Sequence, residues 1–187
     1  SAARIQKFWL VSYATSAIAY WPFDGAATDP VSGYDLGLAG AAGYGGGLFG
    51  QALALGGNAA DYATRPGDDA AFDFGASDFT VQIWVRFATT AGQQTLVEKF
   101  LGPAGPGWTL EKLSDDTLHF YALPTAIMTS APIGFVAGSW NQIVVRRTGS
   151  LFELLRNGTV VASTNGADPL PDSAQPAQKM FESQLLT

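Results

Sequence analysis

Apolar and polar residues alternate one by one along residues 79–87, FTVQIWVRF. The odd positions, from Phe79 to Phe87, are all apolar, and the even positions are polar except for Trp84. Since the side chains of a β-strand point alternately to its two faces, a period of two indicates a strand with one buried face. Residues 79–87 are therefore predicted to form a β-strand.

Short apolar segments recur along the rest of the chain and are separated by turn residues. Asn157-Gly158 is a two-residue hairpin signal, and Ser114-Asp115-Asp116 is a similarly short connection. No long amphipathic helix is indicated, and residues 180–186, MFESQLL, suggest only a weak amphipathic turn. The other predicted strands are residues 18–23, 93–100, 108–113, 117–123, 140–147, 151–156 and 159–163. Many short strands predict an all-β fold, either a sandwich or a barrel.

Residues 25–60 are rich in Gly and Ala and allow two interpretations. A segment of this composition can be a flexible linker. However, Leu and Tyr residues recur through it, among them Tyr34, Tyr44 and Leu53, which is more apolar surface than a solvated linker needs. We therefore expect short strands joined by glycine turns.

Composition narrows the class of protein. The chain has 187 residues, of which 47% are hydrophobic and 14% charged, with a formal net charge of −6 and no Cys. It is long enough for one domain with its own core. Ten dispersed basic residues argue against a nucleic-acid partner, and the lack of Cys excludes disulfides, thiolate zinc sites and cysteine nucleophiles. No apolar run reaches 18 residues, so membrane insertion is not expected.

The apolar segment 8–21 also allows two interpretations. It follows Arg4 and Lys7, as the core of a signal peptide follows basic residues. Polar residues interrupt it, however, and its end merges with the strand predicted at 18–23. A structural segment is the preferred interpretation.

Four blocks of sequence resemble one superfamily in their order and spacing. They are IAYWPFDG (18–25), LGGNAADYATRPGD (55–68), AFDFGASDFTVQIWVRF (71–87) and SWNQIVVRRTGSLFELLRNGTVVAS (139–163). Together they look like the laminin-G-like, concanavalin A-like jelly roll. The resemblance implies an all-β fold, a concanavalin A-like jelly-roll β-sandwich of two antiparallel sheets. It divides the chain into an N-terminal arm or extra strand (1–16), the sandwich (17–164) and a Pro-rich C-terminal tail (165–187).

One feature of the family is not recognisable in this chain. Such domains usually finish with a further strand pair, whereas residues 165–187 are Pro-rich and lack that signature. A missing strand would leave an open sheet edge. Either the N-terminal stretch or a neighbouring chain could fill it by strand addition.

The superfamily also includes glycoside hydrolases, which need two carboxylates on one cleft face. The related endoglucanases place these groups as Glu-x-Asp-x-x-Glu, and no Glu of this chain has that spacing. Glu111 is the best single candidate. A Ser-His-Asp triad would have to use His119, and no Gly-x-Ser-x-Gly motif is present. We therefore expect that the protein is not an enzyme.

Calcium is the one cofactor that the sequence suggests. Residues 20–80 carry a formal charge of −7, and five aspartates crowd into its last part. Calcium takes several oxygen ligands from loops, and laminin-G-like relatives frequently bind it at the rim. Aspartates in turns also bond local backbone amides, so this second interpretation stays open. The candidate ligands are Asp61, Asp68, Asp69, Asp73 and Asp78.

Sugar-binding members of this fold rely on exposed aromatic residues that stack on a sugar ring. The resemblance therefore points to Trp108, Tyr44 and Tyr62, which lie near predicted loops, although each could instead pack in the core. The leading hypothesis is a non-catalytic, lectin-like recognition or adhesion module that binds a glycan or a protein at a surface. The alternative is a structural assembly subunit, such as a virion decoration or fibre protein, that self-associates through its N-terminal arm and open sheet edge. Both hypotheses favour an extracellular or virion surface.

Overall fold

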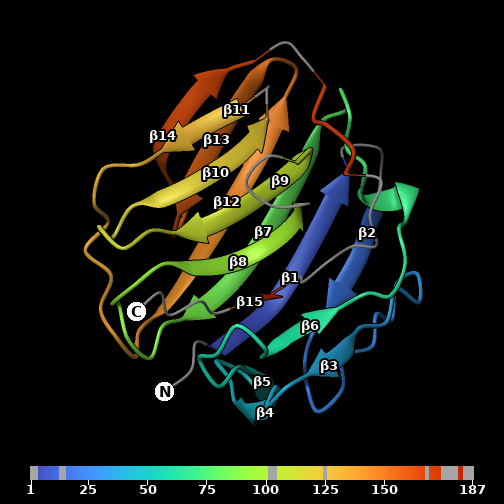
Figure 1. The fold of residues 1–187 in the computed structure, drawn as a ribbon, viewed down its shortest axis with the longest axis vertical. Coiled ribbons are helices and arrows are strands. Elements are labelled where there is room, and N and C mark those ends of the chain that lie inside the picture. The colour runs from blue at the N-terminus through green and yellow to red at the C-terminus, as the bar shows by residue number, and fades with distance from the viewer. Residues whose placement is uncertain are drawn as a thin grey trace.

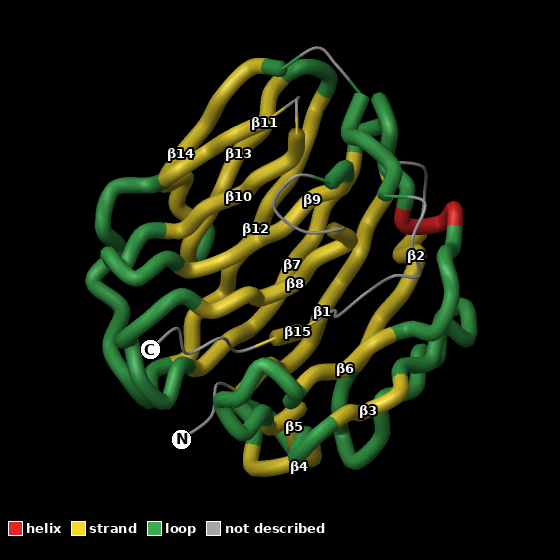
Figure 2. Tube along the Cα trace, viewed as in Figure 1, coloured by secondary structure: helices red, strands yellow, loops and turns green. Residues whose placement is uncertain are grey.

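The computed structural model describes residues 4–12, 16–100, 105–123, 126–166, 169–173 and 181–182. Two antiparallel β-sheets pack against each other, and nearly all the regular structure is strand (Figure 1, Figure 2). Within these described residues the only helix is a single 3-10 turn, η1 (Ala70–Phe72). The architecture confirms the predicted all-β class and the concanavalin A-like sandwich.

Sheet A has eight strands. They are β1 (Arg4–Ser12), β2 (Ser16–Trp21), β4 (Gly43–Gly46), β5 (Gln51–Ala54), β7 (Phe79–Arg86), β12 (Trp140–Thr148), β13 (Leu151–Arg156) and β14 (Thr159–Asn165). Their order is β14-β13-β12-β7-β1-β5-β4, and β2 pairs with β1 beside this path. Every odd residue of β7 is buried and every even residue is partly exposed. The alternation in the sequence is therefore the alternation between the core face and the outer face of sheet A.

Sheet B has seven strands. They are β3 (Gly37–Ala39), β6 (Tyr62–Thr64), β8 (Gln94–Phe100), β9 (Gly107–Lys112), β10 (Leu118–Leu123), β11 (Ala126–Thr129) and β15 (Phe181–Glu182). Their order is β11-β10-β9-β8-β15-β6-β3. β3 lies in sheet B, while β4 and β5 form a hairpin in sheet A, so the Gly-rich segment holds short strands as expected.

The predicted turns connect neighbouring strands. Between β13 and β14, Asn157 and Gly158 have φ values of 49° and 81°, the left-handed geometry that a tight two-residue hairpin requires. Between β9 and β10, Asp116 has a φ of 69°. Both turns consist of residue types that tolerate this backbone region, which is why they were recognisable in the sequence.

Segments near the two ends of the chain pair within the sandwich. β1 pairs with β7 from Arg4 opposite Arg86 to Ser12 opposite Phe79, and it pairs with β2 and β5 on its other side. β15 lies between β8 and β6. The interpretation of this C-terminal segment as an amphipathic turn is wrong for residues 181–182, because their pairing depends on strands distant in sequence. The domain boundaries at 16–17 and 164–165 stay predictions.

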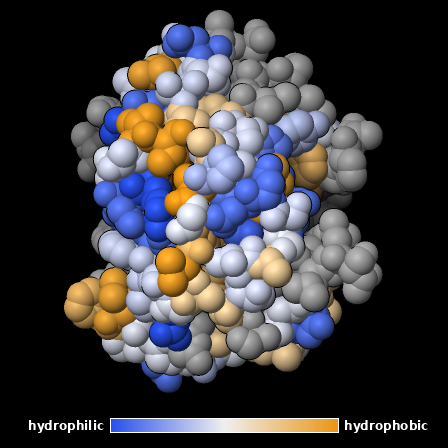
Figure 3. Space-filling view, turned by 90° about the vertical axis from the view of Figure 1, so that its left-hand side faces the viewer, coloured by the Kyte–Doolittle hydropathy of each residue, from blue (hydrophilic) through white to orange (hydrophobic). Residues whose placement is uncertain are grey.

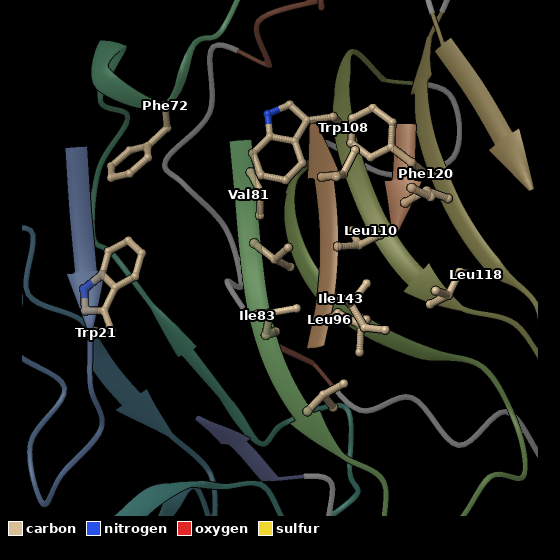
Figure 4. Close-up of a cluster of buried hydrophobic side chains, with 14 of the residues drawn as sticks. Trp21, Phe72, Val81, Ile83, Leu96, Trp108, Leu110, Leu118, Phe120 and Ile143 are labelled. Carbon is tan, nitrogen blue, oxygen red and sulfur yellow. The ribbon is translucent and has the colours of Figure 1, made fainter. Parts of the chain in front are cut away.

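The hydrophobic core lies between the sheets (Figure 4). Val81 and Ile83 enter it from sheet A, and Leu110 and Phe120 enter it from sheet B; all four are fully buried. The alternating pattern of each strand thus supplies one layer of the core. Burial of apolar surface from both sheets is the main stabilising contribution in such a sandwich.

The edge of the sandwich beside β14 shows hydrophobic patches separated by hydrophilic residues (Figure 3). Val160 of β14 and Leu151 of β13 are among the exposed apolar side chains, at 44% and 38%. Single exposed apolar residues are common on folded domains and need no partner to explain them. Across the part of the chain that the structure describes, no helix has the length and apolarity to span a membrane.

Candidate functional site

A transverse row of polar residues crosses the outer face of sheet B. The strand register places Thr129, His119, Glu111 and Thr95 opposite one another on β11, β10, β9 and β8. The residues on either side of His119 in the sequence belong to the hydrophobic core. Because successive side chains of a strand alternate between its faces, this row points away from the core.

Glu111 is held in place by His119 of this row and by Gln93, which directly precedes β8. Its Oε1 lies 2.9 Å from Nδ1 of His119, and Nε2 of Gln93 donates a hydrogen bond to its Oε2. Glu111 is only 8% exposed. Each carboxylate oxygen can accept more than one hydrogen bond, so Glu111 retains acceptor capacity in a fixed position.

Aromatic side chains lie beside this polar row. Tyr121 follows His119 by two residues on β10, so both are on the outer face, and their ring centroids are 5.7 Å apart. The Tyr121 ring also packs edge-to-face on Phe100 of β8, with centroids 5.6 Å apart and planes at 86°. Two ring neighbours fix the orientation of Tyr121, which thereby adds a rigid apolar surface to the polar row.

Thr109 lies between these groups. It pairs with Tyr121 on β10 and with Glu98 on β8, and it is 5% exposed. Its Oγ1 is buried and has no hydrogen-bond partner among the described residues. Leaving a buried hydroxyl unpaired costs about 1–3 kcal/mol. The Thr109 hydroxyl therefore lies on the outer face of sheet B without a hydrogen-bond partner among the described residues.

We call this set of outer-face residues the polar-aromatic cluster: Gln93, Phe100, Thr109, Glu111, His119 and Tyr121. It combines fixed donors and acceptors with a rigid ring, which suits ligands that carry both hydroxyl groups and C–H faces. Sequence reasoning weighed Glu111 and His119 only as catalytic candidates and missed the other four. The period-two pattern of residues 117–123 could have placed His119 and Tyr121 on one face, but their neighbours on β8 and β9 depend on strand register.

The three aromatic residues selected from the sequence lie in different surroundings. Trp108 is 2% exposed and packs against Phe74 and Phe120, with centroids 5.3 and 6.3 Å away. It is therefore a core residue, and the expectation that it offers a stacking surface is corrected. Tyr44 is a half-buried residue of β4 that packs on the core, where burial raises its pKa. Tyr62 is half-buried on β6, so neither tyrosine belongs to the polar-aromatic cluster.

Asp61 binds backbone groups of its own loops. It is 2% exposed, and its Oδ1 accepts a hydrogen bond of 2.7 Å from the backbone N–H of Ala41. This bond is the main reason that the pKa of Asp61 lies below its usual value, and further hydrogen bonds from Asn58 and Gly56 add to it. Its carboxylate is thus already used to hold the Gly-rich segment together.

Asp69 and Asp78 have similar local roles. Asp69 caps η1 by accepting a hydrogen bond from the backbone N–H of Ala71, and it pairs with Arg65 at 3.0 Å. Asp78 accepts a 2.7 Å hydrogen bond from the backbone N–H of Gly149. The second interpretation of the acidic segment, turn and cap formation, therefore describes Asp61, Asp69 and Asp78.

Asp68 and Asp73 meet a third carboxylate, that of Asp172, with ligand atoms within 4.8 Å of one another. The Nζ atom of Lys99 lies among them, 2.9 Å from Asp68 and 3.0 Å from Asp172 and bonded also to Asp73. Burial alone would lower the pKa of Lys99, but hydrogen bonds to these three carboxylates raise it above its ordinary value. Burial also raises the pKa of Asp73, against the effect of Lys99. The Lys99 ammonium therefore lies among the three carboxylates and offsets part of their negative charge.

Comparison with known proteins places these features in a family. A family model described as the concanavalin A-like lectin/glucanases superfamily matches residues 56–179. No curated protein matches the chain. The binding domain of Paraclostridial Mosquitocidal Protein 1 superimposes with a TM-score of 0.65 at 13% identity, over 96% of this chain and 45% of that one. Domain 4 of AbnA, a GH43 extracellular arabinanase from Geobacillus stearothermophilus in complex with arabinotriose, gives 0.62 at 13% identity, over 98% and 89%.

These likenesses differ in what they establish. At 13% identity, the two solved structures show a common fold alone, and this chain spans less than half of the first one. The family match extends over well more than half of the chain and includes β7 to β14, the strands that carry the polar-aromatic cluster. The chain belongs to the concanavalin A-like lectin/glucanase superfamily.

Proposed function

We propose that this protein is a non-catalytic carbohydrate-binding module that takes an oligosaccharide on the outer face of sheet B. The observation that carries the proposal is the polar-aromatic cluster, in which Glu111 is fixed by His119 and Gln93 beside the ring of Tyr121. An extended sheet face suits a linear sugar chain better than a compact metabolite, because several strands contribute contacts in one row.

Each group of the cluster has a role in this proposal. The C–H face of a sugar ring carries partial positive charge and packs on the negative face of the Tyr121 ring. Glu111 accepts hydrogen bonds from sugar hydroxyls, and Gln93 can both donate and accept them. Thr109 Oγ1 gains the partner that it lacks among the described residues. Rigid positions keep the entropic cost of binding low.

The structural neighbours support the same class of function. One is a domain of an arabinanase in complex with arabinotriose, and the other is the binding domain of a mosquitocidal protein. Both are single domains of larger proteins. A binding module is therefore the reading that these neighbours favour for this chain, and arabinotriose is the first ligand to test.

Strand pairing within the chain favours the binding module over the assembly subunit. The assembly hypothesis rested on an apolar N-terminal arm and an open sheet edge. β1 instead has partners on both sides within its own chain, and β15 bridges β8 and β6. The N-terminal strand and the C-terminal strand β15 thus have intramolecular partners.

The test is isothermal titration calorimetry with arabinotriose, followed by a panel of neutral oligosaccharides. We expect one ligand class to bind the wild type, and Tyr121→Ala to weaken that binding at least about tenfold. Thr80→Ala, on the outer face of sheet A, is the matched control and should leave the Kd unchanged. Failure of every neutral oligosaccharide to bind, or equal loss in both variants, overturns the proposed site.

A separate experiment tests whether the protein has catalytic activity. The wild type is incubated with the oligosaccharide that binds it best, and the mixture is analysed for shortened products. An unchanged ligand agrees with a binding module. Turnover that disappears in Glu111→Gln shows instead that the cluster is an active site.

A further inference from the structure

The outer face of sheet A carries a second group of aromatic and polar residues, on the opposite side of the sandwich from the polar-aromatic cluster. Trp84 and Arg86 lie at even positions of β7, where residues are partly exposed. The register places Trp84 opposite Gln142 and Arg86 opposite Trp140 on β12. These four side chains are all half-exposed and are neighbours across the two strands: two tryptophans, an arginine and an amide.

Arg86 has an unusual setting in this group. Its guanidinium lies over the Trp140 ring, 5.2 Å from the centroid, a geometry in which the cation is attracted to the ring face. Among the described residues no carboxylate lies within ion-pair distance of Arg86. Arg146, on the same face of β12, differs because it pairs with Glu153 at 2.7 Å. The positive charge of Arg86 therefore has an aromatic neighbour but no described counter-ion.

β1 borders this group along the other side of β7. In the register, Arg4 is directly opposite Arg86 and Gln6 is directly opposite Trp84.

Amide groups flank the central tryptophan. Gln142 is opposite Trp84 on β12, and Gln82 is two residues away from Trp84 on the same face of β7. No described side chain forms a hydrogen bond or ring contact with Trp84. Amides both donate and accept hydrogen bonds, as sugar hydroxyls require. The ring of Trp84 between two amides therefore matches the faces and hydroxyl groups of a sugar.

We propose that the outer face of sheet A is a second binding site, specific for an acidic oligosaccharide whose sugar rings carry carboxylate groups. Trp84 packs on one ring, Gln82 and Gln142 bind its hydroxyls, and Arg86 binds the carboxylate. The guanidinium group matches a carboxylate with two parallel hydrogen bonds. An acidic peptide would satisfy Arg86 but would leave the tryptophan and amide pattern unexplained. This site is independent of the one proposed on sheet B.

The experiment compares trigalacturonate with its methyl ester by titration calorimetry. Esterification removes the charge and keeps the sugar rings, so the acid should bind at least about tenfold more tightly than the ester. Arg86→Gln should remove this preference. Arg146→Gln removes a paired arginine from the same face and should leave the Kd for trigalacturonate unchanged. A thermal melt of each variant verifies that it is folded.

Three outcomes overturn the proposal: equal binding of acid and ester, equal loss in Arg86→Gln and Arg146→Gln, or equally tight binding of a triglutamate peptide. Tyr121→Ala separates this site from the one on sheet B. Loss of trigalacturonate binding in that variant assigns the acid to sheet B and also overturns the proposal. If Tyr121→Ala still binds trigalacturonate and no neutral oligosaccharide binds the protein, the site on sheet A is supported. Only the function proposed for sheet B is then refuted.

Discussion

The Nζ atom of Lys99 lies 3.0 Å from Oδ1 of Asp172, so strand β8 is tied directly to a segment seventy-three residues later in the chain. The same ammonium group is 3% exposed and pairs with Asp68 and Asp73, which flank η1. One buried cation therefore joins three segments that are separate in sequence.

Replacing this cation should destabilise the fold. Lys99→Met leaves three neighbouring carboxylates without their counter-ion, and we expect the free energy of unfolding to fall by about 2–4 kcal/mol in urea titrations at neutral pH. Because the folded-state pKa of Lys99 is raised, its ionic contribution is fully present at this pH and is lost only as the pH rises through that value. Arg146→Gln breaks an exposed pair and should cost about 0–1 kcal/mol. Equal effects of the two substitutions would contradict the role of burial.

The same substitution tests calcium. In the wild type, the Lys99 ammonium lies among the three carboxylates and repels a second cation, so calcium and a chelator should give the same melting temperature. In Lys99→Met, the carboxylates of Asp68, Asp73 and Asp172 lose that partner, and calcium should raise the melting temperature. Calcium at 100 times its dissociation constant stabilises by about 2.7 kcal/mol. A calcium-dependent rise in the wild type would refute the view that Lys99 replaces a metal.

Acid should weaken the contacts of Asp61. Its pKa is lowered from 3.8 in the folded state, mainly by the hydrogen bond from Ala41. Its ionised form therefore contributes stability above about pH 4, and that contribution is lost as the pH falls towards the lowered value. Asp61→Asn should cost about 1–3 kcal/mol at pH 7 and should show a smaller loss of stability between pH 4 and pH 2 than the wild type. The exposed Asp24→Asn serves as control, and an unchanged pH profile in Asp61→Asn would exclude this contribution.

Alanine substitutions at two glycines with positive φ distinguish the stability cost of backbone strain from that of steric overlap. Gly33 has a φ of 74° and open space around a built Cβ, whereas a Cβ on Gly40, at 64°, would overlap the Ala60 carbonyl and the Asp61 carboxylate. Gly33→Ala should therefore cost about 1–2 kcal/mol from the left-handed backbone alone. Gly40→Ala should cost clearly more, because buried groups must also move. Differential scanning calorimetry measures both, and equal losses would show that the loop at Gly40 adapts freely.

Thr109→Val should improve stability and impair binding. The substitution keeps the shape of the side chain and removes a buried hydroxyl that has no described partner, so the free energy of unfolding should rise by about 1 kcal/mol. Thr80→Val, on the outer face of sheet A, should change it by less than about 0.5 kcal/mol. If the proposed sugar binds Thr109 Oγ1, the Kd of Thr109→Val rises. A loss of stability would mean that this hydroxyl has a partner within the fold.

Local pattern predicted the strands well because each strand has one buried face. The alternation of residues 79–87 corresponds to β7, and Asn157-Gly158 corresponds to the turn between β13 and β14. The short strands of the Gly-rich segment were also indicated by their recurring apolar residues. Residues 181–182 were misjudged, since a two-residue strand has too little sequence to show a period and depends on β6 and β8 for its pairing.

The candidate sites were less predictable than the strands. Trp108 looked like a loop residue because it follows a Pro-Gly loop, but it is inward-facing on β9 and belongs to the core. Asp68 and Asp73 looked like metal ligands because no local feature shows that Lys99 reaches them. No local pattern identifies Tyr121 as a site residue, because its role depends on its neighbours across the sheet.

By itself, the sequence determined the all-β class and the position of most strands, because these follow from period-two patterns and turn chemistry within short segments. The superfamily was recognisable from the resemblance of four sequence blocks. Tertiary structure alone decided which polar side chains meet. The row from Thr129 to Thr95 and the ring of carboxylates around Lys99 join residues from different strands and loops. Their proximity is set by strand order and register, which depend on the packing of the whole sandwich rather than on any one segment.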